Sequence, residues 1–299
     1  MTNADSVKAR LKNKAISSGK TMQEMLTAYG LERTIYRISI SDYADRFTLK
    51  GGIFLYALFQ GEFARATKDI DLLAEHIPND REEMLRVFRS IFSIQCDDAI
   101  RYDLSSVSVV DITEFNEYHG VNVSVSAYLD RTEIPISIDI GFGDVVYPNR
   151  VKMDFPVLLN MQTPEVYAYS VCSVIAEKFE AIVSLGDANS RYKDFYDICI
   201  LAAKYPLEGT ELKEAVWETF DHRGTGFDDI VAFGKAFAES RIHKTRWDAF
   251  IKKKKALVQM NLETALETIT RLLMPIVESI QESKPFRLRW NPVDMRWEE

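Results

Sequence analysis

The chain has 299 residues, a formal net charge of −8, and 46% hydrophobic and 27% charged residues. This composition is that of a folded globular protein, and it argues against disorder and against a chain coated in nucleic acid. The first residues lack the apolar core of a signal peptide, the apolar runs are too short to span a bilayer, and the three cysteines form no CxxC pair. We therefore expect a cytoplasmic protein without a membrane partner, a disulfide framework or a zinc site.

The first half of the chain mixes helical and strand-like patterns. Apolar residues at helical spacing predict helices in four segments: 6–30, 31–39, 53–63 and 81–92. Alternating polarity or a high content of β-branched residues predicts extended structure in four segments: 67–73, 106–112, 121–129 and 134–140. Residues 47–52 are predicted to be a short strand or an extended entry into a turn. This part of the chain is predicted to form a small sheet, mixed or mostly antiparallel, with helices packed on it.

The second half is predicted to be a helical bundle. After Pro164, helical spacing covers four segments: 171–185, 191–204, 211–220 and 257–283. We place the domain boundary between residues 160 and 161, which gives one domain over 1–160 and a second over 161–299. The expected fold class is α+β, and the aromatic tail 286–297 is expected to pack back on the body as an irregular segment.

Two acidic residues, Asp69 and Asp71, alternate with apolar residues on the predicted strand 67–73. Residues two apart on a strand point to the same face, with Cα atoms roughly 6.5–7 Å apart. Ile70 and Leu72 then face the core, and both carboxylates lie on the opposite face. Such a pair can hold Mg²⁺, which prefers one or two carboxylates plus phosphate oxygens. The alternative is an exposed strand that alternates in polarity without binding anything.

A third carboxylate, Asp139, is predicted to complete the metal site. Ile136, Ile138 and Ile140 occupy one face of the last predicted strand, so Asp139 points to the other face. If this strand lies beside the strand of Asp69, the Asp139 carboxylate can bind a second metal ion. It can also serve as the base for an attacking hydroxyl group.

A pair of glycines, Gly51-Gly52, stands between an extended segment and a predicted helix. A backbone without Cβ atoms can approach a phosphate closely, and the first amides of a helix offer unpaired N–H groups to an anion. Lys50 beside the turn and Arg65 before the acidic pair add positive charge for a nucleotide. A simple tight turn is the alternative interpretation.

The combined pattern is more specific than its parts. Gly-Gly is followed after sixteen residues by Asp-x-Asp, and a further Asp lies on a later strand. This pattern resembles the polymerase-β nucleotidyltransferase superfamily, although Gly52 stands where a serine is common. The resemblance implies transfer of a nucleotide from a nucleoside triphosphate with Mg²⁺, or with Mn²⁺ in its place.

Charged residues also gather on two predicted helices of the second half. Lys178 can grip a phosphate as a point charge, and Asp194 can orient Lys178 or contact a base or acceptor. Asp197 lies four residues after Lys193, which a local ion pair on one helix explains. A solvent-side network of ion pairs between neighbouring helices is the alternative for the whole cluster.

Four segments occur in the order typical of the AbiEii/AbiGii family: 43–52, 65–72, 174–178 and 191–198. The chain therefore resembles this family, whose members are nucleotidyltransferases of bacterial toxin–antitoxin and abortive-infection systems. The resemblance implies a polymerase-β-like domain and a helical domain that together form a cleft. It implies that the family's motif residues are Gly51, Asp69, Asp71, Lys178 and Asp194. Ile53 departs from the small Thr of many relatives.

The resemblance further implies three partners: a nucleoside triphosphate, a tRNA 3′ end that accepts the nucleotide, and a cognate antitoxin protein. Binding of tRNA depends on phosphate contacts. The basic residues available for such contacts include Arg241, His243, Lys244, Arg246, 252–255, Arg287 and Arg289. The lysine run is equally explained as a solvated helix face. Tyr192 and Tyr196 can stack on a base or pack between helices.

Two other functions stay open from the residues alone. The carboxylates also suit a metal-dependent phosphodiesterase or nuclease, which forms product without a triphosphate. A catalytically inactive interaction module is the other alternative, and it predicts no metal binding. The Gly-Gly turn favours a triphosphate-dependent transferase over both.

Overall fold

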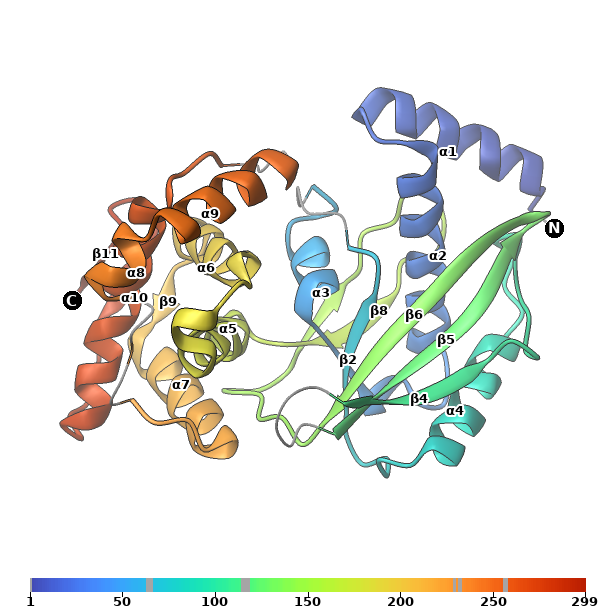
Figure 1. The fold of residues 1–299 in the computed structure, drawn as a ribbon. Coiled ribbons are helices and arrows are strands. Elements are labelled where there is room, and N and C mark those ends of the chain that lie inside the picture. Colours follow the sequence, from blue (N-terminus) through green and yellow to red (C-terminus); the bar gives the residue numbers. More distant parts are fainter. Residues whose placement is uncertain (1, 63–66, 114–118, 228–229, 231–232, 255–257) are drawn as a thin grey trace. The chain divides into compact units, whose positions relative to one another are not determined.

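The computed structural model describes residues 2–62, 67–113, 119–227, 230, 233–254 and 258–299 (Figure 1). Arg65, which we predicted to bind nucleotide, lies outside these ranges. The chain divides into two compact units. The first comprises Met1–Gly143 and Val151–Ala168, and the second comprises Asp144–Arg150 and Tyr169–Glu299. The main change of unit therefore follows Ala168, eight residues after the end of the predicted first domain.

The first unit is built on a mixed sheet. In the part of the chain that is described, this sheet has eight strands in the order β3-β5-β6-β2-β1-β8-β7, and β4 pairs with β5 as well. The strands are β1 Phe47–Lys50, β2 Ile70–Ala74, β3 Ile100–Tyr102, β4 Ser108–Thr113, β5 His119–Leu129, β6 Thr132–Phe142, β7 Val151–Asp154 and β8 Glu165–Ala168. β2 pairs with β6, and β1 with β8, in parallel; the other pairs are antiparallel. The α+β class is confirmed, but the sheet is larger than predicted.

Helices of the first unit are α1 Ala4–Ser18, α2 Met22–Ser39, α3 Gly51–Leu58 and α4 Arg81–Ser93, with a short 3-10 turn at Ala44–Arg46. The two segments 6–30 and 31–39 are thus divided differently from our prediction, because α2 runs unbroken through residue 30. α2 packs on the apolar face of β6. A Cβ atom at Gly30 would come within 2.7 Å of Ile134 and 3.0 Å of Ile136, so glycine permits this close approach.

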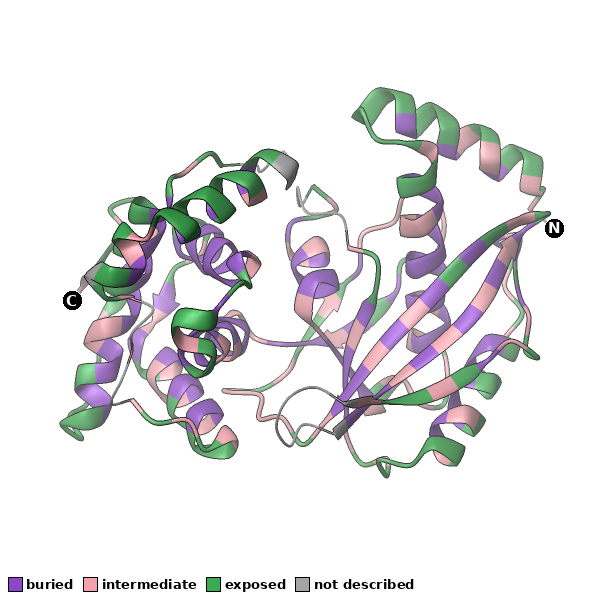
Figure 2. Ribbon diagram, viewed as in Figure 1, coloured by how far each residue is buried: buried purple, intermediate pink, exposed green. Residues whose placement is uncertain are grey.

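Burial alternates along β6, as the sequence predicts (Figure 2). Ile136, Ile138 and Ile140 are buried, whereas Ser137 and Asp139 are partly exposed. Since α2 covers the isoleucine face, Asp139 lies on the face of the sheet that α2 does not cover.

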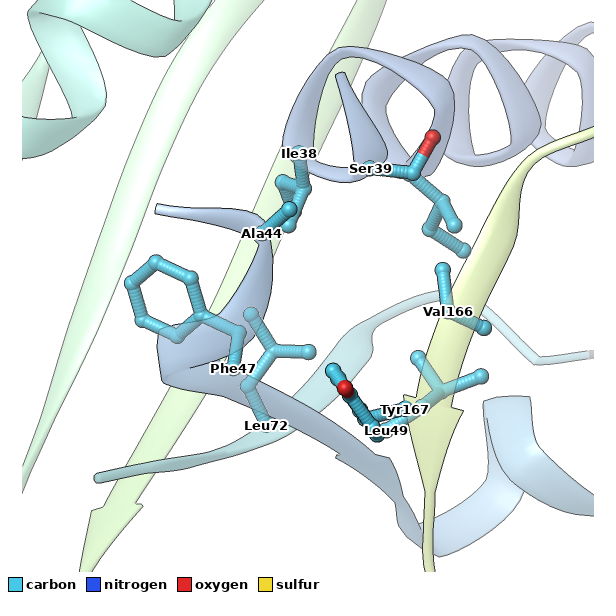
Figure 3. Close-up of a pocket in the computed structure, with 9 residues that line it drawn as sticks. Ile38, Ser39, Ala44, Phe47, Leu49, Leu72, Val166 and Tyr167 are labelled. Atoms are coloured by element: carbon cyan, nitrogen blue, oxygen red, sulfur yellow. The ribbon is translucent and has the colours of Figure 1, made fainter. Parts of the chain in front are cut away.

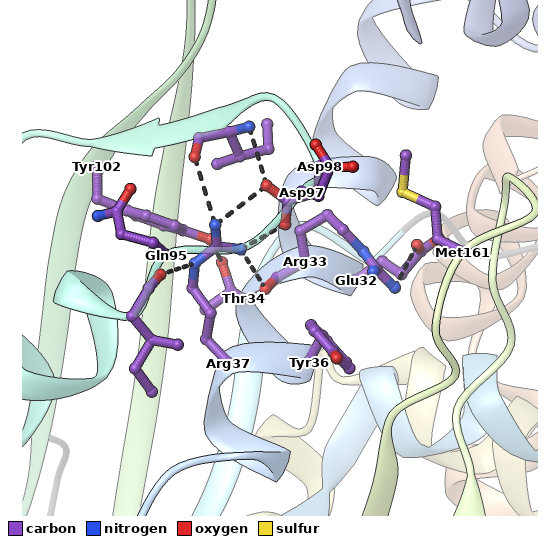
Figure 4. Close-up of polar contacts among 12 residues, drawn as sticks. Glu32, Arg33, Thr34, Tyr36, Arg37, Gln95, Asp97, Asp98, Tyr102 and Met161 are labelled. Carbon is purple, nitrogen blue, oxygen red and sulfur yellow. Dashed lines mark hydrogen bonds and ion pairs between the residues drawn. The ribbon is translucent and has the colours of Figure 1, made fainter. Parts of the chain in front are cut away.

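A buried ion pair fastens α2 to the segment before β3 (Figure 4). The Arg37 guanidinium donates to both carboxylate oxygens of Asp98, at 2.6 and 3.1 Å, and both side chains are almost fully buried. Its remaining N–H groups reach the carbonyl oxygens of Arg33, Ile94 and Ile100. The ring of Tyr102 lies 4.9 Å from the guanidinium carbon. Every donor of this buried arginine is therefore satisfied, as burial of the charge requires.

A small cavity lies between α2 and strands β1, β2 and β8 (Figure 3). Its volume is about 10 Å³, which is space for about one water molecule. The lining is mostly apolar and comprises Ile35, Ile38, Ser39, Ala44, Phe47, Leu49, Leu72, Val166 and Tyr167. The cavity is a gap in core packing and is far too small for a nucleotide.

The second unit consists mainly of helices: α5 Val171–Leu185, α6 Tyr192–Lys204, α7 Gly209–Arg223, α8 Lys235–Glu239, α9 Arg241–Lys254 and α10 Leu262–Gln281, with a 3-10 turn at Gly186–Ala188. The short segment 144–150 belongs to this unit, and hydrogen bonds and an ion pair connect it to α5 and α7. Asp144 pairs with Arg223 at 3.2 Å, and the Tyr147 amide donates to Ser173 Oγ at 2.9 Å.

The aromatic tail packs back on the second unit, but it is regular and not irregular as we predicted. Strands β10 Arg289–Asn291 and β11 Arg296–Glu298 form a three-stranded sheet with β9 Leu207–Glu208, in the order β11-β10-β9. Trp290 is buried, and its indole N–H donates to the carbonyl oxygen of Ala202 at 2.7 Å. Among the described helices, none combines the length and the apolar composition that crossing a membrane requires.

Replacing Arg37 with alanine should lower the free energy of unfolding of the first unit by about 3–5 kcal/mol, because Asp98 would stay buried without its partner. Arg86 is the matched control, since it forms an exposed ion pair with Glu83; the Arg86→Ala variant should unfold almost as the wild type does. Hydrogen exchange of the α2 amides across a denaturant series measures both. Equal losses in the two variants would show that the buried pair does not stabilise α2.

Candidate active site

The acidic pair is divided between strand β2 and the bend before it. Asp71 lies on β2 and is partly buried, with Ile70 and Leu72 buried on the opposite face. The predicted orientation of these three residues is therefore confirmed. Asp69 precedes the first residue of β2 and is exposed, so the strand begins later than we predicted.

Four polar residues form a row across neighbouring strands of the sheet. Lys50 on β1 is in register with Asp71 on β2, Asp71 with Asp139 on β6, and Asp139 with Asn122 on β5. Residues in register on adjacent strands point to the same face and lie roughly 5 Å apart. The predicted neighbourhood of Asp139 and the acidic strand is thus confirmed by the parallel pairing of β2 with β6.

The glycine bend holds the carboxylate of Asp71. Gly51 has φ +62°, and a Cβ atom at this position would overlap the Asp71 carboxylate. The Gly52 amide, at the start of α3, donates to Asp71 Oδ2 at 3.1 Å. We predicted that the amides of the bend face a phosphate; in the structure one of them binds Asp71. Positive backbone charge at the first turn of α3 stabilises the ionised carboxylate.

The electrostatics of this row favour a cation. Burial is the main cause that raises the pKa of Asp71, and repulsion by Asp139 and, more weakly, by Asp69 adds to it. The Gly52 amide and Lys50 act in the opposite direction without cancelling the effect. The three carboxylates therefore influence one another, and a positive ion beside them would relieve the repulsion.

The donor set fits a divalent ion that also binds phosphate. Within the described residues, no three or more His, Cys, Asp or Glu side chains form a group that holds a metal ion by themselves. Mg²⁺ does not require such a group, since one or two carboxylates, waters and substrate phosphates complete its shell. Asp71 and Asp139 supply two hard oxygen donors side by side, and Asp69 is near enough to act on Asp71 electrostatically.

In the second unit, Lys178 of α5 lies between two buried carboxylates of α6. Its Nζ donates to Asp194 Oδ1 at 2.9 Å and to Asp197 Oδ2 at 2.7 Å. Arg191 reaches the other oxygen of Asp194 at 2.8 Å. Burial opposes ionisation of Asp194, but attraction to Lys178 and Arg191 outweighs it and lowers the pKa of Asp194. The cluster joins two helices as predicted, but it is buried and does not face solvent.

Sequence reasoning assigned no site role to three residues of these clusters: Asn122, Arg191 and Asp197. We explained Asp197 by an ion pair with Lys193 on the same helix. In the structure, its carboxylate forms an ion pair with Lys178 on the neighbouring helix. Asn122 was not predicted as a site residue, because an asparagine on a strand does not by itself indicate a function. Only the register of β5 with β6 places it beside Asp139. The possible stacking residues Tyr192 and Tyr196 are buried in the helical core.

The basic residues of the second unit differ in their accessibility. His243 is buried and accepts or donates a hydrogen bond with the Tyr192 hydroxyl at 2.8 Å, so it is not available to an acceptor. On the same helix, α9, four cations are exposed: Arg241, Lys244, Arg246 and Lys252. Buried Trp247 and Ile251 attach α9 to the unit. The side chains of residues 253–257 lie outside the described part.

A comparison with protein-family models identifies the class of enzyme as nucleotidyltransferase. The family model described as nucleotidyl transferase AbiEii toxin, type IV TA system, matches residues 33–268. The chain therefore belongs to the AbiEii family of nucleotidyltransferase toxins, which act in type IV toxin–antitoxin systems. The resemblance inferred from the four sequence motifs is confirmed.

Two solved structures match the chain over most of its length. The crystal structure of JHP933 from Helicobacter pylori has a TM-score of 0.48 and 15% identity, and the match covers 88% of this chain and 95% of that one. A "putative nucleotidyltransferase from H. pylori" has a TM-score of 0.46 and 15% identity, with 86% and 96% covered. No curated protein matches the chain.

Gly19 and Gly51 have similar positive φ angles and provide a test of the contact with Asp71. Gly19, at φ +66°, ends α1 with open space around it, whereas Gly51 lies against the carboxylate. Gly19→Ala should cost about 1–2 kcal/mol of unfolding free energy from backbone strain alone. Gly51→Ala should cost roughly a further 1–3 kcal/mol, because Asp71 must move. Equal costs in denaturant unfolding would contradict the close contact.

Proposed function

We propose that this protein transfers a nucleoside monophosphate from a nucleoside triphosphate to an acceptor, in a reaction that depends on Mg²⁺ or Mn²⁺. The observation that carries the proposal is the register of β2 with β6, which sets Asp71 and Asp139 side by side next to the Gly51-Gly52 bend. The proposed metal ligands are Asp71 and Asp139, which lie side by side, and Asp69 of the bend before β2, which would join them when the ion binds. A bound divalent ion would supply the charge that offsets the phosphate oxygens in the transition state.

In this reaction the acceptor hydroxyl oxygen forms a bond to the α-phosphorus. The bond from that phosphorus to the oxygen bridging to the β-phosphate breaks, and pyrophosphate leaves with the electron pair. Asp139 takes the proton of the hydroxyl group. Lys50 and the first amides of α3 other than that of Gly52, which is bound to Asp71, attract the triphosphate, in keeping with the anion affinity of helix N-termini.

Lys178 and Asp194 are proposed as the catalytic residues contributed by the helical unit. The 2.9 Å contact between them supports a division of roles, in which Lys178 binds phosphate and Asp194 holds Lys178 in place. Asp197 and Arg191 take part in the same arrangement. Lys178 is buried between these carboxylates, so binding a phosphate would require it to exchange one of them for a phosphate oxygen.

The proposed acceptor is the 3′ end of tRNA, and the proposed regulator is a cognate antitoxin protein encoded with the toxin. Family membership supports both. The exposed cations of α9 support the first, because they gather positive charge on one helix of a chain whose net charge is −8. Nucleic acid binds to such a surface chiefly through its phosphates.

The transfer reaction is tested with each nucleoside triphosphate labelled at the α-phosphate, bulk tRNA and Mg²⁺. Asp71→Asn keeps the shape of the side chain but removes its charge, and it should reduce label transfer at least about 100-fold, a loss of several kcal/mol of transition-state stabilisation. Asp130→Asn removes an exposed carboxylate of the same unit that pairs with Lys8, and it should transfer label as the wild type does.

Equal transfer by Asp71→Asn and the wild type would rule out the proposed site. Degradation of the RNA without a triphosphate would instead favour the phosphodiesterase or nuclease. Absence of any product, together with absence of metal binding, would favour the inactive interaction module.

The role of α9 is tested by replacing Arg241 and Lys244 together with glutamine. The double variant should bind tRNA more weakly, and the slope of log affinity against log salt should fall by roughly 1.4–1.8 for two lost phosphate contacts. Its KM for the triphosphate should stay unchanged. Lys12→Gln with Lys20→Gln removes the same charge from exposed positions of the first unit and serves as the control. An equal fall of the slope in both double variants would show that α9 has no special part in acceptor binding.

A further inference from the structure

Both N–H groups of the Asn122 side-chain amide are hydrogen-bonded to residues of β6, and one of these residues is Asp139. Its Nδ2 donates to Asp139 Oδ1 at 2.6 Å and to Ser137 Oγ at 2.7 Å. Ser137 and Asp139 are two residues apart on β6 and point to the same face. A carboxylate only accepts hydrogen bonds, so the amide nitrogen, and not its oxygen, must face Asp139. The orientation of the Asn122 side chain is therefore set by the strand beside it.

We propose that Asn122 is a positioning residue for the metal site, an inference that rests on the proposed function. The amide holds Oδ1 of Asp139, which would leave the other oxygen of this carboxylate available to a divalent ion. Without a hydrogen-bond donor at Oδ1, the Asp139 carboxylate rotates about its Cβ–Cγ bond. Ordering it again when the metal ion binds then lowers the affinity for the metal. Carboxylate ligands of metals are commonly held in this way by a second hydrogen-bonding group.

The chemistry of the donor explains why an amide suits this position. A lysine or arginine in place of Asn122 would neutralise Asp139 and compete with the metal ion for the same charge. A neutral amide orients the carboxylate and leaves its charge available. The one cation of the row, Lys50, lies at the other end beside Asp71. Asp71 itself is held by another neutral donor, the Gly52 amide. Both acids are thus oriented by uncharged N–H groups.

The test measures Mn²⁺ affinity directly, by electron paramagnetic resonance in the presence of a non-hydrolysable triphosphate analogue. Asn122→Ala should weaken Mn²⁺ binding about 10–100-fold. It should raise the metal concentration for half-maximal transfer by a similar factor, while kcat at saturating metal changes much less. Ser137→Ala is the matched control, because it removes the second acceptor of the same amide and leaves the contact with Asp139. It should change Mn²⁺ affinity less than about threefold.

Asp71→Asn separates failure of this inference from failure of the proposed function. If Asp71→Asn weakens Mn²⁺ binding and Asn122→Ala does not, the positioning role is wrong and the metal site stands. If Ser137→Ala weakens binding as much as Asn122→Ala, the effect comes from packing between β5 and β6, and the inference is again overturned. If the wild type binds no Mn²⁺, the metal site and the inference fail together. Thermal unfolding of each variant confirms that the comparison is made on folded protein.

Discussion

The parallel pairing of β2 with β6 is the constraint on which the candidate site depends. It sets Asp71 opposite Asp139, and it does so because the other face of both strands is apolar and buried: Ile70 and Leu72 on β2, Ile138 and Ile140 on β6. A shift of either strand by one residue would turn its carboxylate into the core and all of its inward-facing apolar side chains out to water. The core therefore decides the register, and the register brings the acids together.

Burying Asp71 and placing Asp139 beside it both cost free energy, and the raised pKa of Asp71 reflects burial first and repulsion by Asp139 second. Burial of the isoleucine face contributes far more, since each fully buried aliphatic side chain stabilises the fold by about 1.5–3 kcal/mol. The site also lies on strands and at the first turn of a helix, where the backbone is held by the sheet and by α2 behind it. Such a support keeps ligand oxygens in place better than a loop does.

The part of this arrangement that is local in sequence was predictable. Alternation along Ile136, Ile138 and Ile140 predicted both the strand and the direction of Asp139, and Gly51-Gly52 marked the bend before α3. Strands β3, β7 and β8 were missed because three or four residues show too little alternation to be recognised. The contact of Asn122 with Asp139 joins the two strands of a hairpin, and that of Lys178 with Asp197 joins two consecutive helices. Register and helix packing create these contacts, so no spacing rule along one segment reveals them.

The two clusters differ in what a mutation can reveal about them. Asp71 is partly exposed, and asparagine keeps its shape, so a lost activity there reports on charge and metal binding. Lys178 is buried between two carboxylates, and its removal leaves both without their common partner, at a cost of about 3–5 kcal/mol. Loss of activity in Lys178→Ala would therefore follow from unfolding of the helical unit as readily as from lost phosphate binding. Arginine keeps the charge at this position while changing its geometry. A folded but inactive Lys178→Arg variant is the result that would separate a catalytic lysine from a structural one.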